Sequence, residues 1–314
     1  MRGRAGARAL VTGGAGFIGS HLVDRLLAEG HEVCVLDDFS SGRETNLEHA
    51  KSKIELIRGS ICDGDSVARA MKGCAVVFHE AAVPSVPRSV AEPLRTNAAN
   101  LDGTLLVLET ARRMGVGRVV FAASSSAYGD TETLPKVESM PATPLSPYAL
   151  QKYAGEVYCR LYHELYGLET VALRYFNVFG PRQNPESEYA AVIPRFIRAC
   201  LRGESPRIYG DGEQSRDFTF VSDAVEANLL AARAPRAAGH VINVAGGRRT
   251  SLNQLFAAIR LQTGAKVEAI HEKARVGDVR HSFASLDRAQ ELLGYAPAVE
   301  LNLGLAKTIE SLRV

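Results

Sequence analysis

The fold is decided by the stretch Arg8-Ala9-Leu10-Val11-Thr12-Gly13-Gly14-Ala15-Gly16-Phe17-Ile18-Gly19. The apolar run 8–12 predicts a buried strand, and the apolar spacing from 17 to 27 predicts a helix that ends at Gly30. Residues 31–37 predict a second strand with an acid, Asp37, at its end. The order of strand, glycine turn, helix, strand and acid predicts a dinucleotide-binding unit.

The glycines of this stretch have separate tasks in such a unit. Gly13 and Gly16 permit a tight turn and a close approach of the backbone to a pyrophosphate, and Gly19 lets the helix pack on the strand. Asp37 stands where an acid that binds the ribose is expected. Its carboxylate would repel a 2′-phosphate, which favours NAD over NADP, although Arg43 is close enough in sequence to leave NADP open.

The segments that follow continue the alternation of strands and helices. Residues 54–57, 75–79 and 118–123 predict strands, and residues 66–71 and 101–114 predict helices. This pattern predicts an α/β fold with a Rossmann-like, doubly wound parallel sheet. Ligands of such sheets bind at the carboxyl ends of the strands, so the residues of interest are 13–19, Asp37, 80–83 and 124–126.

After residue 179 the pattern changes to short elements that are interrupted by prolines. Residues 193–201 and 250–263 predict helices, and residues 207–209 predict a short strand. We therefore expect an NAD-binding domain over 1–180 and a smaller C-terminal substrate domain over 181–314, with the active site in the cleft between them. Residues 241–245 are strand-like and are expected to rejoin the large sheet.

Composition and charge exclude several classes of protein. The chain has 314 residues and a net charge of +2, so no field favours nucleic acid or a membrane surface. No apolar run approaches the length of a signal peptide core or a membrane span. The five scattered cysteines predict free thiols in the cytoplasm and indicate neither disulfides nor a metal site.

A possible catalytic group lies beyond the fifth predicted strand. Tyr148 and Lys152 are four residues apart in a predicted helix that Ser146 and Pro147 introduce, so both side chains share one face. A cation beside a phenol lowers its pKa and makes it a usable general base. Ser124 directly follows a predicted strand and is therefore expected at the same ligand edge.

With a dinucleotide site upstream, these residues resemble the extended short-chain dehydrogenase/reductase superfamily, and within it the UDP-hexose 4-epimerases. The similarity is strongest to the bacterial UDP-N-acetylglucosamine 4-epimerases, which share runs such as those at 85–89 and 189–194. The resemblance covers nearly the whole chain, and the segments that carry it are 12–20, 36–42, 124–130, 173–183, 210–212, 216–218 and 277–282.

The resemblance implies roles for individual residues. Tyr148 is the expected base, Ser124 the expected catalytic hydroxyl, and Lys152 the residue that holds the nicotinamide ribose and lowers the pKa of Tyr148. The implied NAD contacts are Gly13, Gly16, Phe17, Ile18, Gly19, Asp37, Asp38, Ser41, Gly42, Ile61, Ala81, Ala82, Tyr148, Lys152 and Tyr175. The implied substrate contacts are Ser85, Ser124, Ser126, Asn177, Ala191, Val192, Tyr209, Arg216, Arg275, Asp278 and Ser282.

The family mechanism moves the C4 hydride of a UDP-sugar to NAD, forms a 4-keto sugar, and returns the hydride to the other face. Two departures matter here. Ser60 replaces an acid that meets the adenine in the family, and the small Ser282 occupies a position where a bulky Tyr excludes N-acetyl groups. UDP-GlcNAc and UDP-GalNAc are therefore permitted, with UDP-Glc and UDP-Gal also plausible. The resemblance also implies a homodimer, formed by a four-helix bundle of helices near 97–113 and 147–166.

Other functions stay open at this point. A nucleotide-sugar dehydratase or decarboxylase needs an acid after the catalytic hydroxyl, whereas this chain has Ser125 and Ser126. A dinucleotide sensor without catalysis would be expected to lack Tyr148 or Lys152, and both are present. A UDP-glucuronate 4-epimerase would need an extra cation near C6 of the sugar, and Arg88 could supply it.

Overall fold

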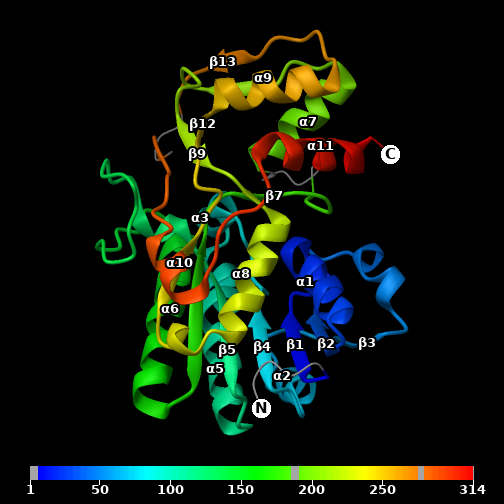
Figure 1. Ribbon diagram of the computed structural model, residues 1–314, viewed down its shortest axis with the longest axis vertical. Coiled ribbons are helices and arrows are strands. Elements are labelled where there is room, and N and C mark those ends of the chain that lie inside the picture. Colours follow the sequence, from blue (N-terminus) through cyan, green and yellow to red (C-terminus); the bar gives the residue numbers. More distant parts are fainter. Residues whose placement is uncertain (1–5, 185–190, 275–278, 314) are drawn as a thin grey trace.

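The computed structural model describes residues 6–184, 191–274 and 279–313. Figure 1 shows a large sheet between helices, with a smaller group of elements beyond one end of its strands. The predicted residues at 275 and 278 lie outside the described part of the chain.

The large sheet has seven strands in the order β11-β6-β5-β4-β1-β2-β3. All its neighbouring strands pair in parallel, and the predicted Rossmann-like fold class is confirmed. The strands are β1 Arg8–Thr12, β2 Glu32–Asp37, β3 Ile54–Arg58, β4 Val76–His79, β5 Arg118–Ser124, β6 Glu169–Tyr175 and β11 Val241–Val244. Most of their side chains are apolar and buried on both faces, as parallel sheets require.

Helices cover both faces of this sheet. One buried cluster joins it to α1 Phe17–Ala28, α8 Val221–Arg233 and α10 Asp287–Leu293. The other joins it to α2 Gly64–Met71, α5 Gly103–Arg113 and α6 Pro147–Tyr166. Helix α6 comes especially close to β5, because a side chain at Gly155 would place a Cβ 2.6 Å from the ring of Phe121.

The helix predicted over 97–113 is regular only from Gly103. Helices α3 Val86–Ala91 and α4 Pro93–Asn97 precede it, and residues Ala98–Asp102 form a π-helical turn. Asn100 in this turn is buried, and its amide bonds to the backbone of Val83 and the side chain of Gln151. The partners of Asn100 lie far away in sequence, so local periodicity does not predict the turn.

The smaller group of elements has a core of its own. Its helices are α7 Val192–Arg202, α9 Leu252–Thr263 and α11 Leu301–Leu312, and they pack around Phe196, Phe256 and Leu305. Its short strands are β7 Val178–Phe179, β8 Arg207–Tyr209, β9 Ser215–Asp217, β10 Thr219–Phe220, β12 Arg249–Ser251 and β13 Ile270–Glu272. The chain between these elements returns to the large sheet as α8, β11 and α10.

A buried ion pair fastens α6 to the sheet. Arg174 on β6 donates to both carboxylate oxygens of Glu156 at 2.9 and 2.7 Å, and the two side chains are 4% and 2% exposed. Because a buried charge without its partner is costly, Arg174→Met should lower the free energy of unfolding by about 3–5 kcal/mol. Urea unfolding followed by circular dichroism measures this.

The double variant Glu156→Leu/Arg174→Met is the control for this prediction. It removes both charges, so its stability should return most of the way to that of the wild-type protein. If the double variant were as unstable as Arg174→Met, lost packing rather than the unpaired carboxylate would explain the defect.

Candidate active site

The glycine turn after β1 lies directly against the backbone that follows β4. Gly13 has a φ of +70°, and a Cβ there would be 2.7 Å from the backbone of Ala81. A Cβ on Gly19 would be 2.2 Å from the carbonyl oxygen of Gly13. Side chains would fill this cradle, so the bare backbone and the N-terminus of α1 fit the pyrophosphate of NAD.

Asp37 is fixed beside this cradle at the end of β2. Its carboxylate accepts hydrogen bonds from the backbone N–H groups of Ala15 and Phe39, both at 2.8 Å. Burial raises the pKa of Asp37, and the two N–H donors counteract the rise. A Cβ on Gly42 would lie 2.9 Å from the carboxylate, so the predicted residues at 37 and 42 are close neighbours.

Two further predicted cofactor contacts at this end point outward. Asp38 and Ser41 are exposed, and Asp38 accepts a hydrogen bond from the N–H of Ser40 at 2.9 Å. The hydroxyl of Ser60 accepts one from the N–H of Cys62 within its own turn. Asp63 caps α2 through the N–H groups of Asp65 and Ser66, so it does not replace the acid missing at position 60.

The predicted catalytic residues converge at the end of β5. The hydroxyl of Ser124 forms a hydrogen bond with Tyr148 and accepts one from the hydroxyl of Ser126 at 2.8 Å. The backbone N–H of Tyr148 donates to the Ser89 hydroxyl at 3.0 Å, which places the first turn of α6. Lys152 is buried, and its ammonium donates to the carbonyl oxygen of Ala122 at 2.8 Å.

The electrostatics of this pair differ from the prediction. Burial raises the pKa of Tyr148, while the hydrogen bond to Ser124 lowers it and the negative charge of Glu80 raises it. Burial also lowers the pKa of Lys152 to about 8. The predicted lowering of the Tyr148 pKa by Lys152 is not found, because the ammonium binds a backbone carbonyl and burial dominates.

Tyr175 reaches the same edge from β6. Its hydroxyl donates to Glu80 at 2.8 Å and accepts a hydrogen bond from the amide of Asn228 at 2.6 Å. Glu80 lies in the segment 80–83, which the sequence singles out because it follows a predicted strand at the ligand edge, but the resemblance implies no role for it.

A cavity of about 270 Å³ opens within the smaller group of elements, where residues 177–179 follow β6. It brings together five of the predicted substrate residues: Asn177, Ala191, Val192, Tyr209 and Arg216. The prediction missed three polar lining residues, Arg195, Arg207 and Gln214. Three guanidinium groups around one cavity suit a phosphorylated ligand.

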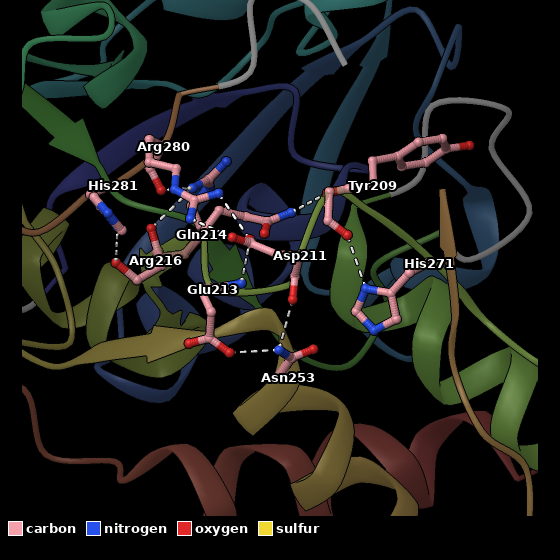
Figure 2. Close-up of polar contacts among 11 residues, drawn as sticks. Tyr209, Asp211, Glu213, Gln214, Arg216, Asn253, His271, Arg280 and His281 are labelled. Atoms are coloured by element: carbon pink, nitrogen blue, oxygen red, sulfur yellow. Dashed lines mark hydrogen bonds and ion pairs between the residues drawn. The ribbon is translucent and has the colours of Figure 1, made fainter. Parts of the chain in front are cut away.

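Figure 2 shows how strand β9, which carries Arg216, and the turn before it are held. The Arg216 guanidinium donates to the carbonyl oxygens of Ser215 at 3.0 Å and Arg280 at 3.3 Å. The amide of Gln214 donates to the Tyr209 carbonyl, and its own oxygen is buried without a hydrogen-bond partner among the described residues. Arg280 also pairs with both carboxylate oxygens of Asp211 at 2.9 and 2.7 Å.

Ser282 lies beside β9, since its N–H donates to the carbonyl oxygen of Ser215 at 3.0 Å. The predicted contacts Ser85, Ser124, Ser126 and Ser282 are not among the residues that line the cavity; Ser124 and Ser126 lie at the end of β5, and Ser85 stands at the start of α3. The hydroxyl of Ser85 caps α3 by accepting the N–H of Arg88. Arg275 and Asp278 lie outside the described residues.

Comparison with known proteins shows which family the chain matches. Residues 9–245 match the family described as "NAD dependent epimerase/dehydratase family". A UDP-glucose 4-epimerase from Mycolicibacterium smegmatis is 44% identical over 310 residues, which cover 98% of each chain.

Two solved structures are similar over almost their whole length. One is a UDP-N-acetylglucosamine 4-epimerase from Methanobrevibacter ruminantium in complex with UDP-N-acetylmuramic acid, with a TM-score of 0.94 and 41% identity over 98% of this chain and 99% of that one. The other is a UDP-glucose 4-epimerase from Thermotoga maritima with UDP-glucose, with a TM-score of 0.93 and 41% identity over 98% of both chains.

Proposed function

The chain belongs to the NAD dependent epimerase/dehydratase family, and from this membership we propose that it is a UDP-hexose 4-epimerase. The predicted family and the predicted cofactor, NAD, are confirmed. The proposed reaction interconverts UDP-GlcNAc and UDP-GalNAc, and also UDP-Glc and UDP-Gal, through a 4-keto sugar. Two features support it: the Ser124–Tyr148–Lys152 group, and the arginine-lined cavity beside it.

The geometry of β5 and β6 joins these two features. Ser124 pairs in register with Tyr175, and Asn177, two residues further along, lines the cavity. A ligand with its diphosphate at Arg216 would therefore extend its sugar toward Tyr148. NAD, when bound, supplies a reversible hydride acceptor for C4 of that sugar.

In this proposal the chain moves one proton at the 4-hydroxyl. Tyr148 accepts this proton. Ser124 orients the hydroxyl of Tyr148 through the hydrogen bond between them, and Lys152 holds the ribose of the cofactor. Asn177 and Arg216 hold the diphosphate while the sugar turns over. Ser282 leaves room at the 2-position, because its side chain is small and its backbone is bonded to Ser215.

The proposed residue roles also divide the chain. We assign residues 1–180, together with the returning elements α8, β11 with the strand region 241–245, and α10, to the cofactor domain and the remainder of 181–314 to the substrate domain. A homodimer would form through α5 and α6, where Met114, Leu150, Leu165 and Tyr166 are exposed. The free cysteines suit a cytoplasmic location.

The alternatives are weaker on the observed contacts. A dehydratase or decarboxylase would need an acid beside Ser124, whereas Ser126 donates its hydroxyl to Ser124 there. A UDP-glucuronate 4-epimerase has one supporting observation. Arg88 is next in sequence to Ser89, whose hydroxyl accepts the backbone N–H of Tyr148, so the chain that carries this cation lies close to the first turn of α6.

The function is tested by incubating the protein separately with UDP-GlcNAc, UDP-Glc and UDP-GlcA, without added reductant. Chromatography should resolve the C4 epimer of UDP-GlcNAc, and of UDP-Glc at a comparable or lower rate. Conversion of UDP-GlcA alone would select the glucuronate epimerase, and no product from any of the three would contradict the epimerase proposal.

Tyr148→Phe should lower kcat by about 10²–10⁴-fold, because the variant lacks the group that accepts the proton. The amount of NAD bound per protein should stay unchanged, and ultraviolet absorbance after denaturation measures it. A variant with near wild-type kcat would show that another group is the base.

Ser282→Tyr should reduce kcat/KM for UDP-GlcNAc at least ten-fold more than for UDP-Glc, because the ring would occupy the space of the N-acetyl group. Ser282→Ala is the matched control, since it removes the hydroxyl without adding volume, and it should convert both sugars. Equal losses on both sugars in the Tyr variant would refute the proposed role of Ser282.

A further inference from the structure

Glu80 is a half-buried carboxylate that the proposed proton transfer does not use. It follows β4 directly, and its N–H donates to the carbonyl oxygen of Thr12 at the end of β1. A Cβ on Gly13 would be 3.1 Å from the carbonyl carbon of Glu80. The backbone of Glu80 therefore lies against the glycine cradle for the pyrophosphate.

Two elements hold the Glu80 carboxylate in place. Tyr175 on β6 donates its hydroxyl to Oε1 at 2.8 Å, and Asn228 on α8 donates to that hydroxyl at 2.6 Å. The same Asn228 amide also donates to the Ala224 carbonyl at 3.0 Å. Tyr175 and Asn228 are buried, so this chain of hydrogen bonds fixes the carboxylate rather than leaving it in solvent.

The carboxylate also faces the catalytic pair on α6. His79 pairs with Phe121 in register, so Glu80 lies level with Ala122, whose carbonyl binds the Lys152 ammonium. The charge of Glu80 acts on both Lys152 and Tyr148. Glu80 thus stands between the pyrophosphate cradle and the catalytic pair, and it would lie near the nicotinamide end of a bound dinucleotide.

We propose that Glu80 determines which redox form of the cofactor the protein binds more tightly. Its carboxylate favours the cationic oxidised nicotinamide over the neutral reduced one. A fixed negative charge at a site shielded from water stabilises a nearby positive charge much more than it does in bulk solvent. An enzyme that must finish each turnover with NAD+ benefits, because it is less easily left with NADH when a keto sugar escapes. This inference rests on the use of NAD and not on the identity of the sugar.

The proposal carries a pH dependence whose direction follows from the surroundings of Glu80. Burial raises its pKa to about 7, against the lowering effects of Tyr175, Lys152 and Asn228. Its neighbour His79 is fully buried with a pKa lowered to about 3, so it is neutral across this range. The preference for NAD+ should therefore be present above pH 7 and fade as the pH falls through 7.

The relative affinity of the protein for NAD+ and NADH is measured in the absence of any sugar. Holoenzyme is equilibrated with mixtures of NAD+ and NADH and separated from free dinucleotide, and the released cofactor is analysed by chromatography. Glu80→Gln keeps the volume and an acceptor for the Tyr175 hydroxyl. At pH 8 it should shift the partition toward NADH by at least about five-fold, the lower end of typical couplings between sites. At pH 5.5 it should shift the partition less than about two-fold.

Glu310→Gln is the matched control, since it removes an equal charge from an exposed position on α11 and should leave the partition unchanged. Stability gives a second readout. Because the folded pKa of Glu80 is raised, the wild-type protein loses stability relative to Glu80→Gln as the pH rises from about 4.5 to 7. Thermal unfolding at pH 5 and pH 8 measures this difference.

Two outcomes would overturn the proposal. One is an equal partition for the wild-type protein and Glu80→Gln at pH 8. The other is a shift of the same size at both pH values, which would assign the effect to shape rather than charge. Neither outcome depends on epimerisation, so a failure of the proposed function would be seen separately in the assay of the three UDP-sugars.

Discussion

The close approach of the glycine turn to the backbone after β4 is the contact on which the carboxyl edge depends. The absence of a side chain at Gly13 lets the turn lie on Ala81, where a Cβ would come within 2.7 Å of the backbone. This contact brings the pyrophosphate cradle, the strand ends of β4 and β5, and the first turns of α6 into one small space. The proposed cofactor site and the proposed proton-transfer group are therefore neighbours because of backbone packing and not because of a charged contact.

Within that space burial outweighs individual charges. It is the largest cause of the raised pKa of Tyr148, the raised pKa of Glu80 and the lowered pKa of Lys152, so each group is pushed toward its neutral form. A site poised in this way responds strongly to any charge that enters it, because the surrounding dielectric is low. The ionisation of Tyr148 is thus better viewed as a property of the occupied site than of its spacing from Lys152.

The sequence predicts most strands of the large sheet and the helices α1, α2, α5 and α6 well, since their apolar periods are local and strong, whereas β6, α8 and α10 are not among the predicted elements. It fails where a partner is distant. The π-helical turn around Asn100 depends on hydrogen bonds with Val83 and Gln151, and the Lys152 ammonium donates to the Ala122 carbonyl oxygen. Arg195, Arg207 and Gln214 become cavity residues only when α7, β8 and the turn before β9 meet, so no short motif marks them.

The proposed binding of the diphosphate by Arg216 and the proposed room for the sugar at Ser282 both depend on one residue, Ser215. Its carbonyl oxygen accepts the guanidinium of Arg216 and the N–H of Ser282, and its hydroxyl bonds His281 at 2.9 Å. The Asp211–Arg280 ion pair links the turn before β9 to the segment at 280–282, but the pair is exposed and adds little to the free energy of unfolding. Because Arg216 and Ser282 both donate to the Ser215 carbonyl oxygen, the segment at 280–282 cannot move outward for a larger sugar without disturbing Arg216. The range of sugars should therefore follow from the size of the side chain at position 282 and not from displacement of its loop.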